Sequence, residues 1–552
     1  MLTPAEFLRD IEIHPHFQSR IVDWLKPWRL KSCVDILIVV DVEISTTPSN
    51  SFGIASVIEL LRSTTVGCMK FRVDIALRSN EAFSVVANPG PTQPKYRGFR
   101  FNSATGGADV IDRYEQIWCF GFKPNNSGSA DDSQIDAAGA LPASNPELNK
   151  LDQWMKDRKG GLFGTGDHHF LGASMCRRIP RLGTMRRWTN ADGVPPIGGI
   201  NRIDTLRPPP PVTSFQAGGP AFLSNGAHQG DLTVQPIRWV AWKSVYWPFA
   251  GKRKRPHPVL CHPTLGPIDV MPDHAHEGLC VPNPNLSANK KFRNEPEYPN
   301  ATDGGPKPQP QIIAYGSNLD SDDWNFAKGA QPGRSNNPMI AVYDGHRAGV
   351  GRVATDSTWH HWMDVNINAL RAANNDDWKK ISRYFINLAL WLNPPGFSTR
   401  CLYLSVVASH FESVGFQEYH PGASTAELGR ALRLHLGKVY GPCWVTERIW
   451  ELAHELRQIP QRHLMELGKR FEGSDIDEED FEDLVLGRMV EATLKPADLV
   501  KGADPGSIKA LAVPEKLFAR PFAAAMADFT KETERRLKLQ SGVVRGLRPV
   551  RG

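Results

Sequence analysis

Three short stretches of the chain carry most of the side chains suited to acid–base or metal chemistry. They are Asp167-His168-His169, Asp273-His274-Ala275-His276-Glu277 and Trp359-His360-His361-Trp362. Histidine titrates near neutral pH and a neighbouring carboxylate can orient its ring, so each stretch offers a general base and a group that positions it. The elements on either side of these stretches decide whether the side chains can act together.

The first stretch follows a short apolar run that begins at Gly161 and predicts a buried strand. Gly164 and Gly166 allow the chain to turn sharply, so Asp167 and His168 are expected at the carboxyl end of that strand. Open α/β sheets bind their ligands at this edge. The alternative is that Asp167 caps the following helix and His168 packs against the sheet.

The second stretch suits a divalent metal ion if it is extended. The side chains of a strand alternate in direction, which places His274 and His276 on one side and Asp273 and Glu277 on the other. Two imidazoles on one side can converge on an ion such as zinc, with nitrogens about 2 Å from it. The alternative is a polar loop whose carboxylates cap helices.

The third stretch follows Asp356, in the turn after a predicted strand. Trp359 and Trp362 could exclude water and form a wall against a sugar ring or base, while His360 and His361 bond its polar groups. The two tryptophans could equally belong to the core, with satisfied histidines between them.

The cysteines and two further histidines add little. Eight cysteines are scattered without a CxxC pair, which predicts reduced and mostly buried thiols. Cys119 and Cys261 are the thiols placed to act as nucleophiles, although buried and inert thiols are expected there. His257 and His262 could supply further metal ligands.

The predicted elements alternate between strand and helix. Strands are predicted at 34–42, 71–77, 116–122, 339–343 and 351–354, in addition to the one that begins at Gly161, and helices at 53–62, 148–159 and 376–392. This order favours an α/β fold with a doubly wound, mostly parallel sheet of the flavodoxin-like kind.

The chain divides into three predicted parts. Residues 1–30 form a helical segment, 31–398 the α/β domain with an insertion at about 189–337, and 399–552 an all-helical domain. Within the insertion a strand is predicted at 237–246. In the last part helices are predicted at 424–439, 446–458, 460–470, 478–494 and 521–539, the first with Ser424 and Glu427 as a capping box.

Composition limits the class of protein. The chain has 552 residues with 41% hydrophobic content, and no apolar run approaches the roughly 20 residues of a membrane span. The first 30 residues lack the layout of a signal peptide, which favours the cytoplasm. The net charge of +6 is small for this length, so nucleic acid is a weak candidate partner, through 252–255 and 535–551.

Several of these motifs together resemble a known family. The strand order, the G-L-F-G-T-G-D-H-H turn, His257-Pro258 and the G-R-V-A-T-D-S-T-W-H-H segment before a long helix resemble the class I glutamine amidotransferase-like superfamily, closest to the ThuA-like (trehalose utilisation) branch. The resemblance covers roughly residues 30 to 395. It implies the α/β fold above and hints at a carbohydrate-related substrate. An amidotransferase would carry G-x-C-x-G at the elbow, where this chain has Thr165, Gly166 and Asp167, so glutaminase activity is not expected.

Two hypotheses about function follow. The first is a hydrolase or lyase acting on a small polar, carbohydrate-like substrate, with Asp167, His168, Glu277 and His360 in catalysis and a divalent, zinc-like metal held by His168, His274, His276 and His360. The second is a catalytically silent scaffold or sensor, whose helical part at 399–552 mediates self-association or binds a protein partner.

Overall fold

The fold is known for most of the α/β part and for much of the C-terminal part. The computed structural model of the chain describes residues 33–41, 44–48, 53–123, 143–166, 171–188, 232, 234–246, 254–272, 279–284, 286, 291–318, 334–412, 423–455, 478–493 and 515–546. The predicted helical segment at 1–30, most of the insertion and the predicted helix at 460–470 lie outside these residues.

A large, mostly parallel sheet forms the centre of the molecule. Its parallel strands lie side by side in the order β3 (Met69–Arg78), β1 (Cys33–Asp41), β8 (Gln116–Phe120), β9 (Gly161–Thr165) and β21 (Val353–Asp356). Beyond β21 the sheet continues with antiparallel strands β20 (Arg334–Tyr343) and β19 (Gln311–Asn318). Ile38 in β1 pairs with Ile75 of β3 and Trp118 of β8, which sets the register at the centre.

Strand β1 is covered on both faces, as its continuous apolar sequence predicts. Ile36, Ile38 and Val40 belong to the core on one face, while Leu37 and Val39 belong to the core on the other. The strands predicted at 34–42, 71–77 and 116–122 correspond to β1, β3 and β8, and β8 ends two residues earlier than predicted, at Phe120.

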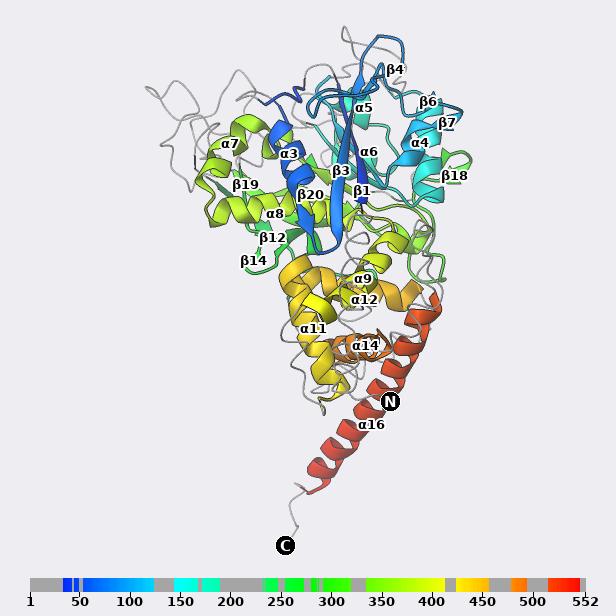
Figure 1. Cartoon of the computed structure of the whole chain (residues 1–552), viewed down its shortest axis with the longest axis vertical. Helices are drawn as coiled ribbons and strands as arrows, with labels where there is room; N and C mark the ends of the chain where they lie inside the picture. Colours follow the sequence, from blue (N-terminus) through cyan, green and yellow to red (C-terminus); the bar gives the residue numbers. More distant parts are fainter. Residues whose placement is uncertain are drawn as a thin grey trace, which may run out of the picture.

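Helices pack on both faces of the sheet. Figure 1 shows α3 (Ala55–Ser63), α7 (Asp364–Ala373) and α8 (Asp376–Trp391) to one side of β1 and β3, and α4 (Asn145–Asp157) to the other. Short helices α5 (Ala173–Cys176) and α6 (Leu182–Met185) add buried side chains to the same core as α4. A mixed α/β fold around a large, mostly parallel sheet is confirmed.

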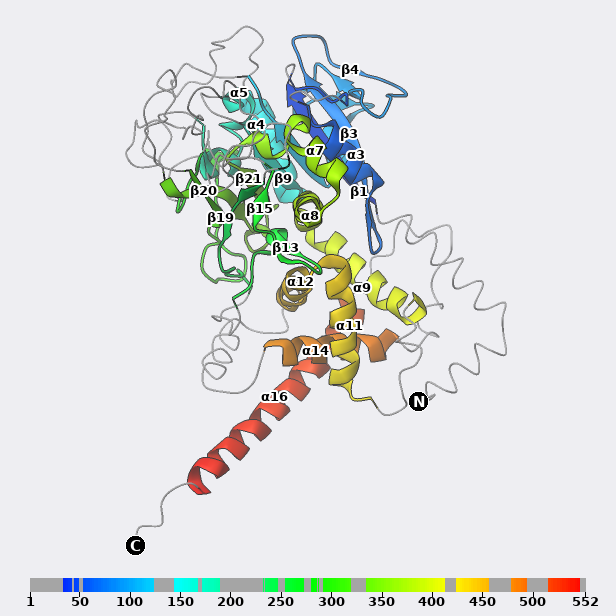
Figure 2. The ribbon, with the colours of Figure 1, turned by 90° about the vertical axis from the view of Figure 1, so that its left-hand side faces the viewer.

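The C-terminal helices gather at one end of the α/β part (Figures 1 and 2). They are α9 (Pro395–Glu412), α11 (Thr425–Tyr440), α12 (Pro442–Glu455), α14 (Glu478–Thr493) and α16 (Glu515–Gly546). Ser424 and Glu427 form the predicted capping box of α11. Buried side chains of all five helices belong to the same core as α3 and α8, and α9 spans the predicted boundary between 398 and 399.

The predicted strand at 237–246 is wrong. Only Arg238–Trp239 (β12) pairs there, with β19 at the edge of the sheet, and the described residues 240–246 form no strand. Edge residues lack a second neighbour to pair with, so an apolar pattern alone does not extend the strand. The helices α7 and α9 and the strand β19 were not predicted.

The remaining described elements are short. The strands are β2 (Thr65–Val66), β4 (Ser84–Val85), β5 (Tyr96–Arg97), β6 (Ala104–Thr105), β7 (Ala108–Asp109), β10 (Arg186–Arg187), β11 (Gln235–Pro236), β13 (Cys261–His262), β14 (Gly266–Pro267), β15 (Val270–Met271), β16 (Leu279–Cys280), β17 (Lys291–Phe292) and β18 (Glu295–Pro296). Single 3-10 turns are η1 (Val110–Arg113), η2 (Pro258–Leu260), η4 (His346–Ala348) and η5 (Trp359–His361).

The cysteine side chains are as the composition predicts. All eight cysteines are free thiols and all except Cys33 are buried, as predicted, including Cys119 and Cys261. Within the described ranges, no helix has the length and apolar character needed to cross a membrane.

Candidate functional site

The carboxyl ends of four parallel strands meet at one edge of the sheet. Asp41 ends β1, Gly121 follows β8, Gly166 follows β9 and Asp356 ends β21. The strand that follows β1 in the sequence, β3, pairs with one edge of β1, and the later strand β8 pairs with its other edge. The order of the strands in the sheet therefore changes direction at β1. Ligands of open α/β sheets bind at this edge.

Backbone contacts hold the ends of β1, β8 and β9 close together. The carboxylate Oδ2 of Asp41 accepts hydrogen bonds from the backbone N–H groups of Phe122 (2.6 Å) and Lys123 (2.7 Å). A Cβ added to Gly121 would lie 2.6 Å from the Cα of Gly172, whose φ is +88°. Only glycine allows the backbones to approach this closely.

A carboxylate–histidine pair lies where β21 ends. The Thr358 hydroxyl accepts from the backbone N–H of His360 (3.1 Å) and so caps the η5 turn. This turn places Nδ1 of His361 2.8 Å and 2.9 Å from the two carboxylate oxygens of Asp356. Both side chains are 0% exposed. We refer to this pair as the Asp356–His361 dyad.

Further donors fix the Asp356 carboxylate. Its Oδ2 also accepts from the indole N–H of Trp362 (3.2 Å) and from the hydroxyl of Tyr384 (3.1 Å). Burial raises the pKa of Tyr384, and the nearby Asp356 raises it further, so the phenol keeps its proton and donates. Because Asp356 only accepts, Nδ1 of His361 carries the proton of this hydrogen bond.

The second ring nitrogen of His361 differs from the first in its hydrogen bonding. Its Nε2 is buried and has no hydrogen-bond partner among the residues that the structure describes. Leaving a buried polar atom unsatisfied costs about 1–3 kcal/mol, so such atoms call for an explanation. With Nδ1–H directed at a carboxylate, Nε2 presents the lone pair of a general base.

His360 has a different environment from His361. Its ring stacks on Trp359, with centroids 4.6 Å apart, and its Nδ1 lies 3.3 Å from the amide nitrogen of Asn366. Trp362 packs against Phe163, with ring centroids 4.6 Å apart, so it is a core residue, as one of the two interpretations predicted. The sequence pointed to His360, whereas the histidine paired with a carboxylate is its neighbour.

The other predicted site residues lie outside the described residues. These are Asp167, His168, His274, His276 and Glu277. Their described neighbours lie near the dyad's strand: Gly166 follows β9, which pairs with β21, and Cys280 Sγ lies 3.8 Å from the carbonyl oxygen of Thr355. That the imidazoles converge stays a prediction.

Three of the four predicted metal ligands, His168, His274 and His276, lie outside the described residues, so the metal site stays a prediction. In the described part of the chain, no group of three or more His, Cys, Asp or Glu side chains is placed to hold a metal ion. His257 Nδ1 accepts from the backbone N–H of Val259 (3.2 Å), and His262 Nδ1 accepts from that of Leu265 (3.0 Å). These two histidines cap local turns.

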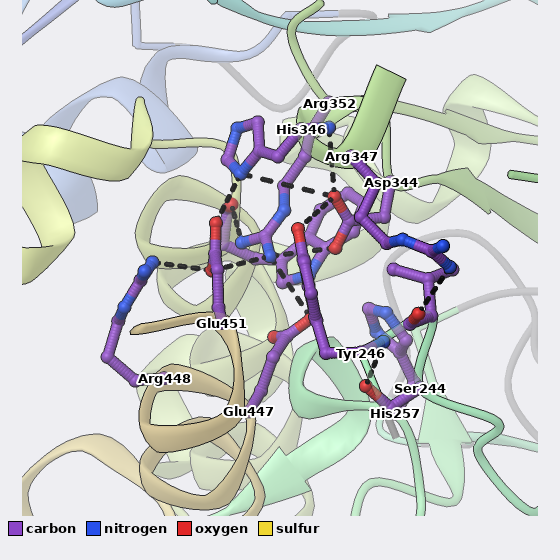
Figure 3. A network of polar contacts seen from close by, with 12 residues as sticks. Ser244, Tyr246, His257, Asp344, His346, Arg347, Arg352, Glu447, Arg448 and Glu451 are labelled. Carbon is purple, nitrogen blue, oxygen red and sulfur yellow. Dashed lines mark hydrogen bonds and ion pairs between the residues drawn. The ribbon is translucent and has the colours of Figure 1, made fainter. Parts of the chain in front are cut away.

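A second polar cluster lies beyond the opposite end of β21 (Figure 3). One nitrogen of Arg352, Nη2, contacts Asp344 (2.8 Å), Glu447 (3.2 Å) and Glu451 (2.9 Å). His346 Nδ1 also contacts Glu451, at 2.5 Å. Arg448 pairs with Glu451 and Glu455. We call Asp344, His346, Arg352, Glu447, Arg448 and Glu451 the Arg352 network.

Protonation within the Arg352 network is uneven. Burial raises the pKa of Glu447 to about 8, against the opposing effect of Arg352, and Asp344 and Glu451 raise it further. Burial alone would raise the pKa of Glu451. The electrostatic effects of Arg352, Arg448 and His346 are larger than the effect of burial and lower this pKa. Burial and then Arg352 lower the pKa of His346. Glu447 is therefore the carboxyl that keeps its proton near neutral pH.

Sequence reasoning missed this cluster. Glu447 and Glu451 are four residues apart on a helix, a spacing that places them on one face. Their partners Asp344 and Arg352 flank strands about a hundred positions earlier. No local pattern connects the two sets.

Comparison with known proteins identifies no relative. No protein-family model, no curated protein and no solved structure matches the chain. The resemblance to amidotransferase-like proteins therefore stays a prediction, and the site must be interpreted from its geometry.

Proposed function

We propose that the protein is a hydrolase or lyase that acts on a small polar substrate by general acid–base catalysis at the Asp356–His361 dyad. The observation that carries this proposal is the contrast between the two ring nitrogens of His361. Nδ1 is bonded to both oxygens of Asp356, whereas the buried Nε2 has no partner among the described residues.

In a hydrolysis, Nε2 of His361 removes a proton from water while the water oxygen attacks an electrophilic carbon of the substrate. Asp356 accepts the Nδ1–H hydrogen bond and stabilises the imidazolium that forms. The imidazolium then returns the proton to the leaving oxygen as the scissile bond breaks. The ring is thereby regenerated, and no redox partner is needed.

The position of the dyad supports the proposal. The parallel strands β1, β3, β8, β9 and β21, numbered in chain order, lie in the order second, first, third, fourth, fifth, and this order supports the flavodoxin-like arrangement that we propose. The dyad lies at the edge where such sheets bind ligands. A carbohydrate-like substrate is part of the proposal on the strength of the ThuA-like resemblance, and a cytoplasmic location is part of it as well.

Turnover assays test the proposal. The wild-type protein is assayed on a panel of p-nitrophenyl esters and glycosides, beside His361→Gln and a control, His435→Gln, on helix α11. We expect turnover of at least one substrate and a loss of about 10²–10⁴-fold in kcat for His361→Gln, with none for the control. The proposal fails if no substrate is turned over or if His361→Gln keeps wild-type activity.

A second candidate function is a catalytically silent scaffold or sensor. The complete burial of Asp356 and His361 favours it, as does the lack of a cysteine at the elbow. Sedimentation of the full chain at rising concentration tests it. A scaffold that works through self-association is expected to form a defined oligomer. This candidate is contradicted if the protein is a monomer at every concentration and also turns over a substrate of the panel.

A further inference from the structure

The Arg352 network joins the sheet to the C-terminal helices. Asp344 follows β20, and Arg352 directly precedes β21. Glu447, Arg448 and Glu451 belong to α12. Figure 3 shows these side chains directed toward one another from the two sides. The network is therefore an interface within the molecule.

The buried charges of the network do not balance if every group is ionised. Three carboxyl groups contact Arg352, and the side chains of Asp344, Glu447 and Glu451 are at most 8% exposed. The buried guanidinium groups are Arg352 and Arg448, each at most 3% exposed. With one proton on a carboxyl group, two negative charges meet two positive ones. Without it, one negative charge is uncompensated in a medium that solvates charge poorly.

Neutral groups complete the surroundings of Glu447. Trp391 of α8 donates its indole N–H to Glu447 (3.2 Å), and the backbone oxygen of the same residue accepts from Arg352 (2.9 Å). The hydroxyl of Tyr246 donates to Asp344 (3.0 Å). His257 packs its ring on Trp391, and burial, with Arg352 nearby, lowers its pKa. Glu455, which is more exposed, pairs with Arg448 and does not supply a positive charge that could compensate Glu447.

We propose that the Arg352 network is a proton-dependent clasp: with a proton on Glu447 it holds helix α12 against the sheet, and loss of that proton weakens the contact. The clasp is independent of any reaction at the dyad.

The pKa values give the direction of this dependence. The pKa of Glu447 rises from its usual 4.5 to about 8, chiefly because the side chain is buried. In the unfolded or undocked chain the carboxyl ionises near its usual pKa, so only the docked state holds the proton between these values. The contribution of this proton to the docking of α12 is therefore largest below pH 4.5. It decreases as the pH rises and is lost above a pH of about 8.

Hydrogen exchange of α12 tests the clasp. Exchange of its backbone amides is followed by mass spectrometry of the full chain at pH 7 and pH 9, after correction for the intrinsic pH dependence of amide exchange. One proton bound with a pKa of about 8 makes undocking about tenfold more favourable at pH 9 than at pH 7. We expect corrected exchange in α12 to rise by that factor in the wild type and by no more than about twofold in Glu447→Gln, which is the part that Glu482 of α14, with a pKa of about 7, can supply.

Two further variants separate Glu447 from its neighbours. Glu482 of α14 accepts from the hydroxyl of Thr446 in α12 (3.2 Å), and burial raises its pKa to about 7. Glu482→Gln is therefore the matched control and should keep the rise in α12 exchange. His346→Gln should keep it as well, because His346 is neutral near pH 7.

Each of the other outcomes overturns the proposal. These are constant exchange in the wild type, a rise of about tenfold that persists in Glu447→Gln, or a rise abolished by His346→Gln or by Glu482→Gln. Glutamine resembles protonated glutamate, so a Glu447→Gln chain that does not fold also contradicts the clasp. Activity plays no part in the readout, so a failure of the proposed function leaves this test intact.

Discussion

The two adjacent histidines of the η5 turn have different partners. Within this single 3-10 turn His361 meets Asp356, while His360 stacks on Trp359. Asp356 accepts from Tyr384 and Trp362 as well, so its orientation does not depend on the histidine. The neighbours of Asp356 therefore hold the carboxylate that aligns the His361 imidazole, as the proposed general base would need.

Replacing Asp356 by asparagine should weaken both stability and function. An amide offers one accepting oxygen, and its nitrogen would face donors such as Tyr384 and Trp362. We expect a loss of about 1–3 kcal/mol in the free energy of unfolding, measured by urea titration at pH 7. Turnover should fall as in His361→Gln. Asp376→Asn, an exposed carboxylate paired with Lys379, is the control and should leave the free energy of unfolding nearly unchanged. Equal costs for the two variants would mean that the partners of Asp356 contribute little.

Helices α11 and α14 cross at close range because both carry glycine at the contact. A Cβ added to Gly429 would lie 1.6 Å from the backbone oxygen of Asp483, and one added to Gly487 would lie 1.8 Å from that of Thr425. Glycine costs about 1 kcal/mol relative to alanine inside a helix. Close packing of α14 against α11 offsets this cost.

Alanine at two glycines of α11 should therefore have opposite effects. Gly429→Ala places a methyl group against backbone that cannot move aside, and we expect a loss of about 1–3 kcal/mol. Gly437→Ala has room, since its nearest neighbour would be 3.7 Å from the new Cβ, and should gain up to about 1 kcal/mol. Thermal unfolding of the two variants beside the wild type measures the difference. A stable Gly429→Ala protein would show that the crossing adjusts.

At the scale of the whole molecule, β21 and α8 each connect the two polar clusters. Arg352 directly precedes β21 and Asp356 ends it. Trp391 and Tyr384 lie on α8, the first bonded within the Arg352 network and the second to Asp356. The dyad and the Arg352 network therefore lie at opposite ends of β21, and their contacts on α8 are about two helical turns apart.

Removing the central cation should cost more than removing a surface one. Arg352→Met leaves Asp344, Glu447 and Glu451 buried without their shared partner, and such losses cost about 3–5 kcal/mol. Arg371→Met breaks an ion pair with Glu59 whose side chains are 36% and 63% exposed, and should cost less than about 1 kcal/mol. Urea unfolding at pH 7 compares them. Similar costs would show that the network contributes no more than a surface pair.

Local sequence patterns predicted most of the longer elements and the edge of the sheet, but not the partners of the site residues. The apolar run of β1 and the capping box at Ser424 depend on residues only a few positions apart, so the sequence alone predicts them. The pairing of His361 with Asp356, in place of His360, depends on how one turn packs against Tyr384. The Arg352 network brings together strand ends and a helix that lie far apart in the chain. Burial fixes its protonation, and burial exists only once the chain has folded.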